Sequence, residues 1–196
     1  MTKKPSLPLV ALEIRSKLVN ATGLDASQVI IGPPHEAARQ QEKAPDKDYL
    51  CVFFYNTGYS GFPADAASND PLYMSAFCLI TALGGRPSSG TPTPGESELN
   101  LIGAVLECFH RNPVLKMERD GVKLHIQIVP AQLSLDDINH LWATQNNTPS
   151  RLSIAYEFVW LPVAPAVRTD GEIQRVAKVE LNVEAFKLES ELEGEP

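Results

Sequence analysis

Residues 151–160 read RLSIAYEFVW, and this stretch alternates apolar with small or polar side chains more regularly than any other part of the chain. Alternation with a period of two is typical of a β-strand, because successive side chains of a strand point to opposite faces of its sheet. The apolar members are Leu152, Ile154, Tyr156, Phe158 and Trp160. We therefore expect a strand over residues 152–160, closed by Pro162 and Pro165.

Other segments carry strand signals of different strength. Val29-Ile30-Ile31 predicts a short strand that ends at Gly32-Pro33-Pro34, because glycine and proline interrupt regular pairing. Residues 49–55 form an apolar run with β-branched and aromatic members, which is typical of a strand buried on both faces. Residues 124–128 alternate again, which predicts a strand with one face in water and an end at Pro130.

Helical signals lie between these segments. The repeat of Val10, Ile14 and Leu18 predicts a first helix, because residues four apart share one helix face. Asp70-Pro71 is typical of a helix start, since Asp accepts a hydrogen bond at the N-cap and proline fits the first turn. This second helix is expected to run to Leu83 and to end at Gly84-Gly85.

Two further helices are expected in the second half of the chain. One starts near Ser97 and ends at Asn112-Pro113. Its predicted apolar stripe consists of Leu99, Ile102, Val105, Leu106 and Phe109. The other follows Ser134, which forms a capping-box variant with Asp137. Asp136 is also well placed for the helix dipole, and the inward-facing residues of this helix are expected to be Ile138, Leu141 and Trp142.

The remaining segments define the organisation of the chain. Residues 35–48, 56–69 and 86–95 are expected to be loops, because they are polar, glycine-rich or proline-rich. The expected domains are 1–168, a C-terminal strand extension over 169–188 and a disordered acidic tail over 189–196. Within the extension, residues 176–188 read as an amphipathic strand, or as a helical turn from Val183 onward. The order predicts an α+β fold with a mixed, largely antiparallel sheet flanked by helices.

Composition excludes several classes of protein. The chain has 196 residues with 17 Lys and Arg against 24 Asp and Glu, a formal net charge of −7. An acidic protein is a poor candidate for coating nucleic acid or an anionic membrane. The apolar run 72–83 is too short to span a bilayer, and the N-terminus lacks the apolar core of a signal peptide. We therefore expect synthesis in the cytoplasm without a signal peptide.

The search for catalytic chemistry yields only weak candidates. Cys51, Cys78 and Cys108 lie in apolar runs assigned to one strand and two helices, where inert buried thiols are the usual outcome. Asp136, Asp137 and His140 could share a helix surface, where a carboxylate three residues from a histidine can orient it for catalysis or metal binding, but helix capping already explains both acids. No phosphate loop, zinc motif or nucleophile motif occurs, so a non-enzymatic domain is favoured.

Several segments, taken in order, resemble one known family. They are 70–75 with 79–84, then 98–115, and then 133–138 with 141–142 and 151–157. They resemble the cap, or tail-terminator, family of contractile injection systems, the phage-tail-like particles typified by the anti-feeding prophage and the virulence-cassette type. The sequence departs from the family pattern at Leu83 and after Trp142, and neither position concerns a catalytic group.

The resemblance implies a structural protein with no enzymatic activity, no cofactor and no metal. It implies a homohexameric ring that ends polymerisation of the inner tube and sheath and anchors the sheath, in a particle that can be released from the cell. Its implied partners are copies of itself, the inner tube protein and the sheath protein, with no nucleic acid and no membrane. An adaptor or chaperone for an injected cargo protein, acting through residues 86–95 and the acidic tail, is the alternative.

Two sets of residues follow from this interpretation. The structural anchors are Asp70, Pro71, Trp142 and Tyr156. The residues expected to pair with a sheath subunit or a neighbouring copy are Lys178, Val179, Glu180, Leu181, Asn182 and Val183. An amphipathic strand at a chain end can add to another subunit's sheet or fold back onto its own sheet, and the sequence leaves both alternatives open.

Overall fold

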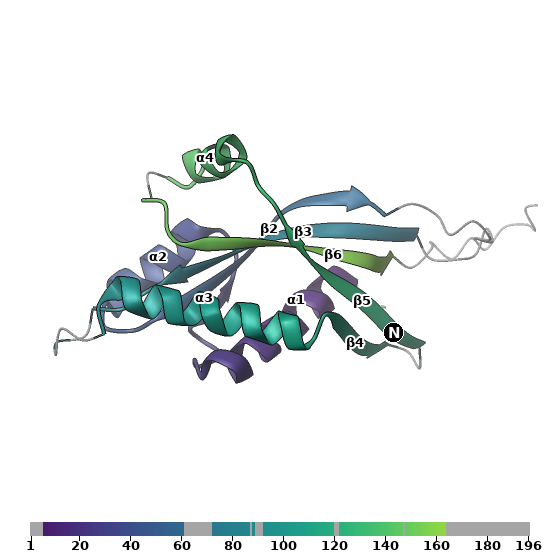
Figure 1. The fold of residues 1–196 in the computed structure, drawn as a ribbon, viewed down its shortest axis with the longest axis horizontal. Helices are drawn as coiled ribbons and strands as arrows, with labels where there is room; N and C mark the ends of the chain where they lie inside the picture. Colours follow the sequence, from purple (N-terminus) through teal and green to yellow (C-terminus); the bar gives the residue numbers. More distant parts are fainter. Residues whose placement is uncertain are drawn as a thin grey trace, which may run out of the picture. The chain divides into compact units, whose positions relative to one another are not determined.

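The computed structural model describes residues 6–60, 72–86, 88, 92–119, 122–146 and 148–163 of the chain. Contacts divide the chain into one unit, Met1–Pro165, and a second, Ala166–Pro196, which lies outside the described residues together with the expected strand extension. The elements of the first unit are, in order, α1 (Ser6–Thr22), β1 (Val29–Ile31), α2 (Pro34–Lys43), β2 (Tyr49–Tyr59), β3 (Leu72–Leu83), α3 (Pro94–Arg111), β4 (Val114–Arg119), β5 (Val122–Ala131), α4 (Leu135–Ala143) and β6 (Ser153–Val163) (Figure 1).

The described strands form one six-stranded sheet in the order β1-β2-β3-β6-β5-β4. β1 pairs with β2 in parallel, and every other neighbouring pair is antiparallel. β6, the strand over the most regular stretch of sequence, lies between β3 and β5 in the middle of the sheet. The expected fold class, a mixed and largely antiparallel sheet flanked by helices, is confirmed.

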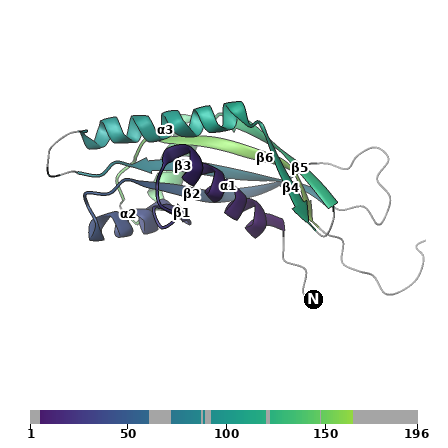
Figure 2. The same cartoon turned by 90° about the horizontal axis from the view of Figure 1, so that it is seen from below.

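Helices cover both faces of the sheet. α1 and α3 lie side by side on one face (Figures 1 and 2), where the three predicted residues of α1, Val10, Ile14 and Leu18, are all buried. They pack into the main core with Leu50, Val52, Ile80, Val105, Ile126, Tyr156 and Phe158. Phe158 is fully buried and its ring contacts those of Phe54 and Phe109, so this face of β6 carries the centre of the core.

The opposite face of the sheet is covered by the two shorter helices. Ala37 of α2 packs against Tyr49, Cys51 and Leu83 in a second, smaller core. Trp142 of α4 is buried, and its side chain lines a cleft with Leu79 and Ala155. His35 Nδ1 on α2 lies 3.3 Å from Oε1 of Gln145, in the turn that follows α4.

Residues 72–83 form strand β3, so the helix expected there is wrong. β3 lies between β2 and β6, with Cys78 paired to Phe54 on one side and to Tyr156 on the other. A strand buried on both faces reads as a continuous apolar run, and such a run cannot be told from a buried helix by periodicity alone. The tertiary pairing decides, and Cys78 therefore lies on a strand.

Two other elements were not expected. Residues 34–43 form helix α2 although the sequence there suggests a loop, because Pro34 starts the helix and strong helix formers such as Glu, Ala, Gln and Lys continue it. The buried residues of α2 are Pro34 and Ala37, so this segment lacks the apolar periodicity that would predict a helix. Strand β4, directly after α3, was not expected. It has only six residues, and the exposed charged side chains of Lys116 and Glu118 stand between its apolar residues.

The boundaries of the remaining elements differ in detail. α3 starts at Pro94 instead of Ser97, since Thr93 and Glu96 form a capping box. β2 continues to Tyr59, four residues beyond the expected end. Pro130 and Pro162 lie inside β5 and β6 instead of ending them. Strand β1, the strand over residues 152–160 and the capping box of α4 are confirmed.

Candidate interaction surfaces

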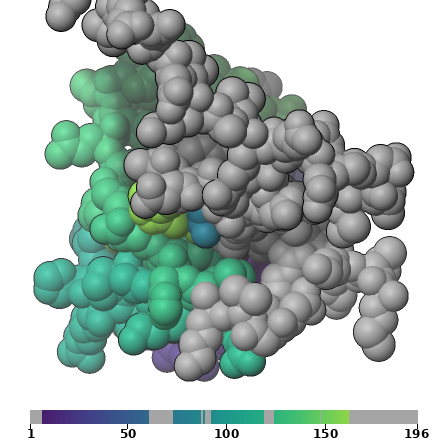
Figure 3. Space-filling view, turned by 90° about the vertical axis from the view of Figure 1, so that its right-hand side faces the viewer, coloured from purple at the N-terminus to yellow at the C-terminus, as the bar shows by residue number. Residues whose placement is uncertain are grey.

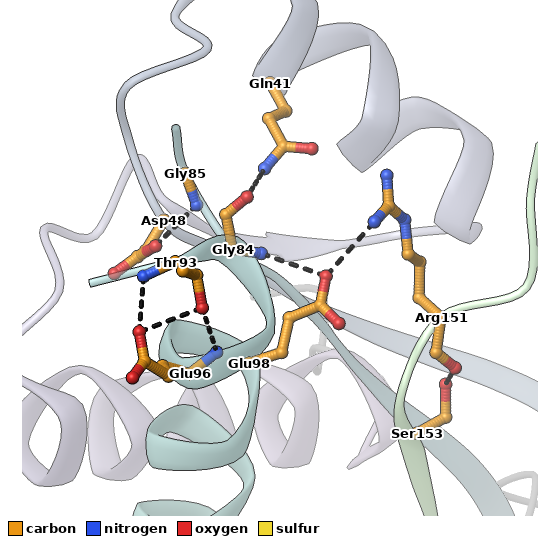
Figure 4. A network of polar contacts seen from close by, with 9 residues as sticks. All are labelled: Gln41, Asp48, Gly84, Gly85, Thr93, Glu96, Glu98, Arg151 and Ser153. Atoms are coloured by element: carbon orange, nitrogen blue, oxygen red, sulfur yellow. Dashed lines mark hydrogen bonds and ion pairs between the residues drawn. The ribbon is translucent and has the colours of Figure 1, made fainter. Parts of the chain in front are cut away.

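A polar junction holds together the end of the sheet at which β3 ends and α3 begins (Figure 4). The Glu98 carboxylate, on the second turn of α3, accepts hydrogen bonds from Gly84 N and Arg151 Nη1, each at 3.3 Å. The Arg151 backbone carbonyl in turn accepts a hydrogen bond from Ser153 Oγ at the start of β6. The side chain of Glu98 is only 12% exposed, so this ion pair is largely shielded from water.

The glycines of this junction permit a close approach of backbones. A Cβ atom on Gly84 would lie 2.0 Å from the Pro94 carbonyl oxygen, and one on Gly85 would lie 2.5 Å from the Asp46 carbonyl oxygen. The Gly85 amide donates to Asp48 Oδ1 at 2.7 Å, and the Gln41 side chain donates to the Gly84 carbonyl at 2.8 Å. The junction therefore joins α2, β2, β3, α3 and β6 by satisfied bonds, which is a structural arrangement.

A row of aromatic side chains lies on the sheet face that α2 and α4 cover in part. We call Phe53, Tyr55, Phe77, Tyr73 and Trp160 the aromatic row. Ring centroids are 6.5 Å apart for Phe53 and Tyr55, 6.2 Å for Tyr55 and Phe77, and 5.7 Å for Tyr73 and Trp160. Partial burial and then the nearby negative groups, among them Asp137 and Glu157, raise the pKa of Tyr55. The row is half-buried, and its outermost member, Trp160, is 40% exposed.

Trp160 owes its position to a bulge in β6. The register of β3 with β6 shifts between Met74 and Ala76, so that two residues of β6, Val159 and Trp160, stand opposite the single residue Ser75. Trp160 has φ 66°, a left-handed conformation that a bulky side chain rarely adopts. Such bulges redirect a side chain, and here the result is an edge-to-face contact with Tyr73. Large, partly exposed aromatic side chains of this kind are enriched at protein interfaces.

Helix α3 presents a second candidate surface. Leu99 and Leu106, assigned to the buried stripe from sequence, are 65% and 45% exposed. That part of the prediction is wrong, because Leu101 takes the inward position beside Ile102, Val105 and Phe109. Gly103 lies between the two exposed leucines on the helix, and a Cβ there would meet nothing within 4 Å. The outer face of α3 thus offers two apolar side chains with open space between them.

The acidic residues and histidine of α4 form a helix cap. Asp137 Oδ2 accepts hydrogen bonds from Ser134 Oγ at 2.6 Å and from Ser134 N at 3.2 Å, and these bonds lower the pKa of Asp137. His140 is exposed one turn further along the helix. The Asp137 carboxylate is therefore engaged in the helix cap. This is the interpretation that the sequence favoured over a catalytic role.

The three thiols occupy separate and unequal environments. Cys51 is buried, donates to the Gly32 carbonyl at 3.0 Å, and has its pKa raised to about 12 by burial and the negative charge of Glu36. Burial also raises the pKa of Cys78. Cys108 on α3 is half-buried, with a smaller elevation of its pKa from the same cause. Burial is thus as expected for Cys51 and Cys78 and incomplete for Cys108.

The remaining predicted site residues divide into two groups. Trp142 and Tyr156 are buried, and the Tyr156 ring packs edge-to-face on Phe109 at 4.8 Å. Asp70, Pro71 and residues 178–183 lie outside the described residues. In the described ranges no cluster of His, Cys, Asp and Glu could hold a metal ion. Of the helices described, none has the length and apolarity required to cross a membrane.

Comparison with known proteins gives a family and a fold. Residues 9–176 match the model of the Pvc16 N-terminal domain. A tube-terminating cap of the anti-feeding prophage has a similar fold, with 16% identity and a TM-score of 0.54. The match covers 87% of this chain, which spans only 58% of that cap. A sheath/tube terminator of the PVC extracellular contractile injection system, in its extended state, matches over 94% of this chain and 72% of its own at 16% identity, with a TM-score of 0.43. No curated protein matches.

Proposed function

Because the chain belongs to the Pvc16 N-terminal domain family, we propose that it is a structural cap that ends the inner tube and sheath of an extracellular contractile injection particle. The family match over residues 9–176 carries this proposal, since it spans the whole described sheet and its helices. The likeness in fold to a tube-terminating cap supports it. The chain is part of a particle in this proposal and has no catalytic role.

The ring is the finer part of the proposal. A closed ring of identical subunits needs two different surfaces on each copy, one contacting the other on the next subunit. Leu99 and Leu106 on α3 and the aromatic row on the opposite side of the sheet are two apolar surfaces on different faces of one subunit. We assign the neighbour contacts of a homohexamer to these two surfaces.

The tube and sheath contacts belong to the same proposal. The inner tube protein and the sheath protein are the proposed partners, and neither nucleic acid nor a membrane has a part in it. Residues 178–183 are the proposed strand for pairing with a sheath subunit or a neighbouring copy, because their apolar side chains alternate with polar ones. Deletion of residues 170–196 tests that role, which is wrong if particles still assemble at normal length with a firmly attached sheath.

The ring contact is tested by substitution of the exposed leucines. Leu99→Asp together with Leu106→Asp places two charges at the proposed interface while the buried stripe of α3 stays intact. Leu135→Asp is the matched control, because Leu135 is equally apolar and 79% exposed but lies on α4. We expect native mass spectrometry and negative-stain images to show rings for the unmodified chain and the control, and single subunits for the double variant.

The same experiment has a result that contradicts the proposal. An unmodified chain that stays a single subunit, and that does not associate with purified inner tubes, is not a cap. Co-purification with a cargo protein, in the absence of tube and sheath, favours the adaptor function instead. Circular dichroism of each variant, compared with that of the unmodified chain, separates loss of assembly from loss of folding.

A further inference from the structure

The outer edge of β4 carries backbone groups that pair with none of the described strands. β4 is the last strand in the sheet order and lies antiparallel to β5. Ile128 N donates to the Pro113 carbonyl at 2.8 Å, and hydrogen-bonded pairs alternate with non-hydrogen-bonded pairs along such a ladder. Every second residue from Pro113 onward thus bonds to β5, while Lys116 and Glu118 direct their N–H and C=O groups away from it.

The side chains of β4 alternate between the two faces of the sheet. Leu115 is fully buried and Met117 is half-buried against the main core. Lys116 and Glu118 are exposed on the opposite face. A strand added to this edge therefore places a side chain beside Met117 on one face and meets one positive and one negative charge on the other.

The described helices leave the β4 edge uncovered, because they lie over other parts of the sheet. The principal sheet contacts of α1 are with β1 and β6, those of α2 with β2 and β3, and those of α3 with β3. α4 follows the far end of β5, and β4 and β5 extend beyond the end of α3 (Figures 1 and 2). Figure 3 views this end of the sheet, with the teal and green atoms of the β4–β5 region on the left. A second extended strand can therefore reach the edge without displacing a described helix.

We propose that two copies of the chain pair through their β4 edges, antiparallel to each other and about a two-fold axis at Met117. The sequence across this edge is Lys116-Met117-Glu118. In the proposed register Met117 lies opposite Met117 of the second copy, and Lys116 of each copy lies opposite Glu118 of the other. Opposite charges directly across a pair of strands stabilise it, so the edge is complementary to itself. A two-fold contact of this kind joins one surface patch to the same patch on the other copy.

Other antiparallel registers of the two edges are less favourable. A shift of one residue sets Met117, whose backbone groups bond to β5, opposite a residue whose backbone groups point outward, so the hydrogen bonds between the copies are lost. A shift of two residues sets Lys116 opposite Lys116 in one direction and Glu118 opposite Glu118 in the other. Like charges directly opposite each other in a sheet are destabilising. The charges thus select the register, and the outward N–H and C=O groups of Lys116 and Glu118 supply the backbone hydrogen bonds.

The contact is small and independent of the proposed ring. A strand of 6 residues from each copy buries far less than the about 1,600 Å² of a stable interface, and exposed ion pairs add little affinity. We therefore expect pairs at high protein concentration and single subunits at the low concentrations of native mass spectrometry. The contact uses neither the outer face of α3 nor the aromatic row, so it does not rest on the cap function. Its expected effect is to limit strand addition at the β4 edge to two copies, where an open edge would add strands without a fixed register.

Exchange of the charges tests the register. The variants carry Leu99→Asp and Leu106→Asp as well, which removes the proposed ring contact, and sedimentation equilibrium at high concentration measures the dissociation constant of the pair. Lys116→Glu and Glu118→Lys each place like charges opposite each other and should weaken pairing at least about tenfold. An equal mixture of these two variants, and a variant with both exchanges, regain opposite charges and should pair as the original edge does.

A substitution elsewhere on the surface controls for net charge. Lys47 is exposed in the turn before β2, and Lys47→Glu changes the net charge by the same amount as Lys116→Glu. We expect the Lys47→Glu variant to pair as the original edge does. Absence of pairing at the highest concentration, equal weakening by Lys47→Glu and Lys116→Glu, or failure of the mixed variants to pair overturns the proposal.

Disulfide trapping tests the position of the two-fold axis. Across the contact, Met117 and its counterpart form a non-hydrogen-bonded pair, the geometry with the closest Cα atoms, so Met117→Cys should oxidise to a disulfide-linked dimer. Glu118→Cys is the matched control, because its two cysteines would lie two residues apart along the paired strands, beyond the reach of a disulfide. Both variants are made in a Cys108→Ser background. Dimer yields that are equal for the two variants, or absent for Met117→Cys, overturn the proposal.

Discussion

At the scale of single residues, Trp160 shows how the backbone is used to place a side chain. Its φ of 66° lies in the left-handed region, which is strained for tryptophan but not for glycine. In this conformation the Trp160 ring contacts the ring of Tyr73. The bulge thus holds an aromatic side chain half in solvent, where it can contribute to an interface.

Substitution separates the two effects at Trp160. Trp160→Ala and Trp160→Gly both remove the ring, but only glycine relieves the left-handed backbone. We therefore expect the glycine variant to be more stable than the alanine variant by about 1 kcal/mol. Denaturant unfolding of the two variants measures this difference. Equal stabilities, or a less stable glycine variant, would show that residue 160 carries no backbone strain.

The thiols provide a second prediction at this scale. The thiolate is the reactive form, and burial both raises the pKa of Cys51 and Cys78 and blocks access to them. We expect a maleimide reagent to label Cys108 in the native chain much faster than the other two, with all three labelled in denaturant. Peptide mapping by mass spectrometry measures how fast each of the three cysteines is labelled. Labelling of Cys51 at the rate of Cys108 contradicts the described burial.

At the scale of elements, the start of α3 couples the helix to the sheet. The Glu96 carboxylate accepts hydrogen bonds from Thr93 N at 2.6 Å and Thr93 Oγ1 at 2.9 Å, and these bonds lower the pKa of Glu96. The capping box is adjacent in sequence to Pro94, whose carbonyl requires a glycine at position 84. One short turn therefore fixes both the first residue of α3 and the end of β3.

The depressed pKa of Glu96 predicts how the cap depends on pH. A carboxyl group whose pKa is lower in the folded chain stabilises the fold above its ordinary pKa of 4.5, and this contribution is lost as the pH falls through the folded value. Glu96→Gln should therefore lower the unfolding midpoint at neutral pH, and the difference should shrink at about pH 3. A difference between the two proteins that is independent of pH contradicts the assigned charge interaction.

Elements also differ in how far sequence alone predicts them. β6 and α1 were predictable because each has one buried face, so the apolar period is visible. β3 was not, because neighbours on both sides and helices on both faces make nearly all its positions apolar. Helix α2 was missed for the opposite reason, since only Ala37 and the partly buried Ala38 pack into the second core, too few apolar residues to show a helical period. Leu99 and Leu106 were misplaced because a surface leucine has the same sequence signal as a buried one.

At the scale of the whole molecule, the described unit combines a packed core with apolar side chains left on two faces. A buried core around Phe158 needs no partner, whereas Leu99, Leu106 and Trp160 remain partly in solvent. The Asp137 carboxylate is engaged in the capping box of α4 and two of the three thiols are buried, whereas the contacts proposed for a ring lie on the outer face of α3 and on the aromatic row. Sequence periodicity does not mark such surfaces, whereas the family resemblance does indicate the class of protein.

The position of the chain on an assembled particle tests the cap function most directly. Particles are assembled with the chain carrying a small epitope tag, and gold-labelled antibody against the tag is located by electron microscopy. A cap of the tube and sheath predicts label at one end of each particle, the end opposite the baseplate, and none along the sheath. Label distributed along the particle length, or particles of normal length that carry no label, would contradict the proposed function.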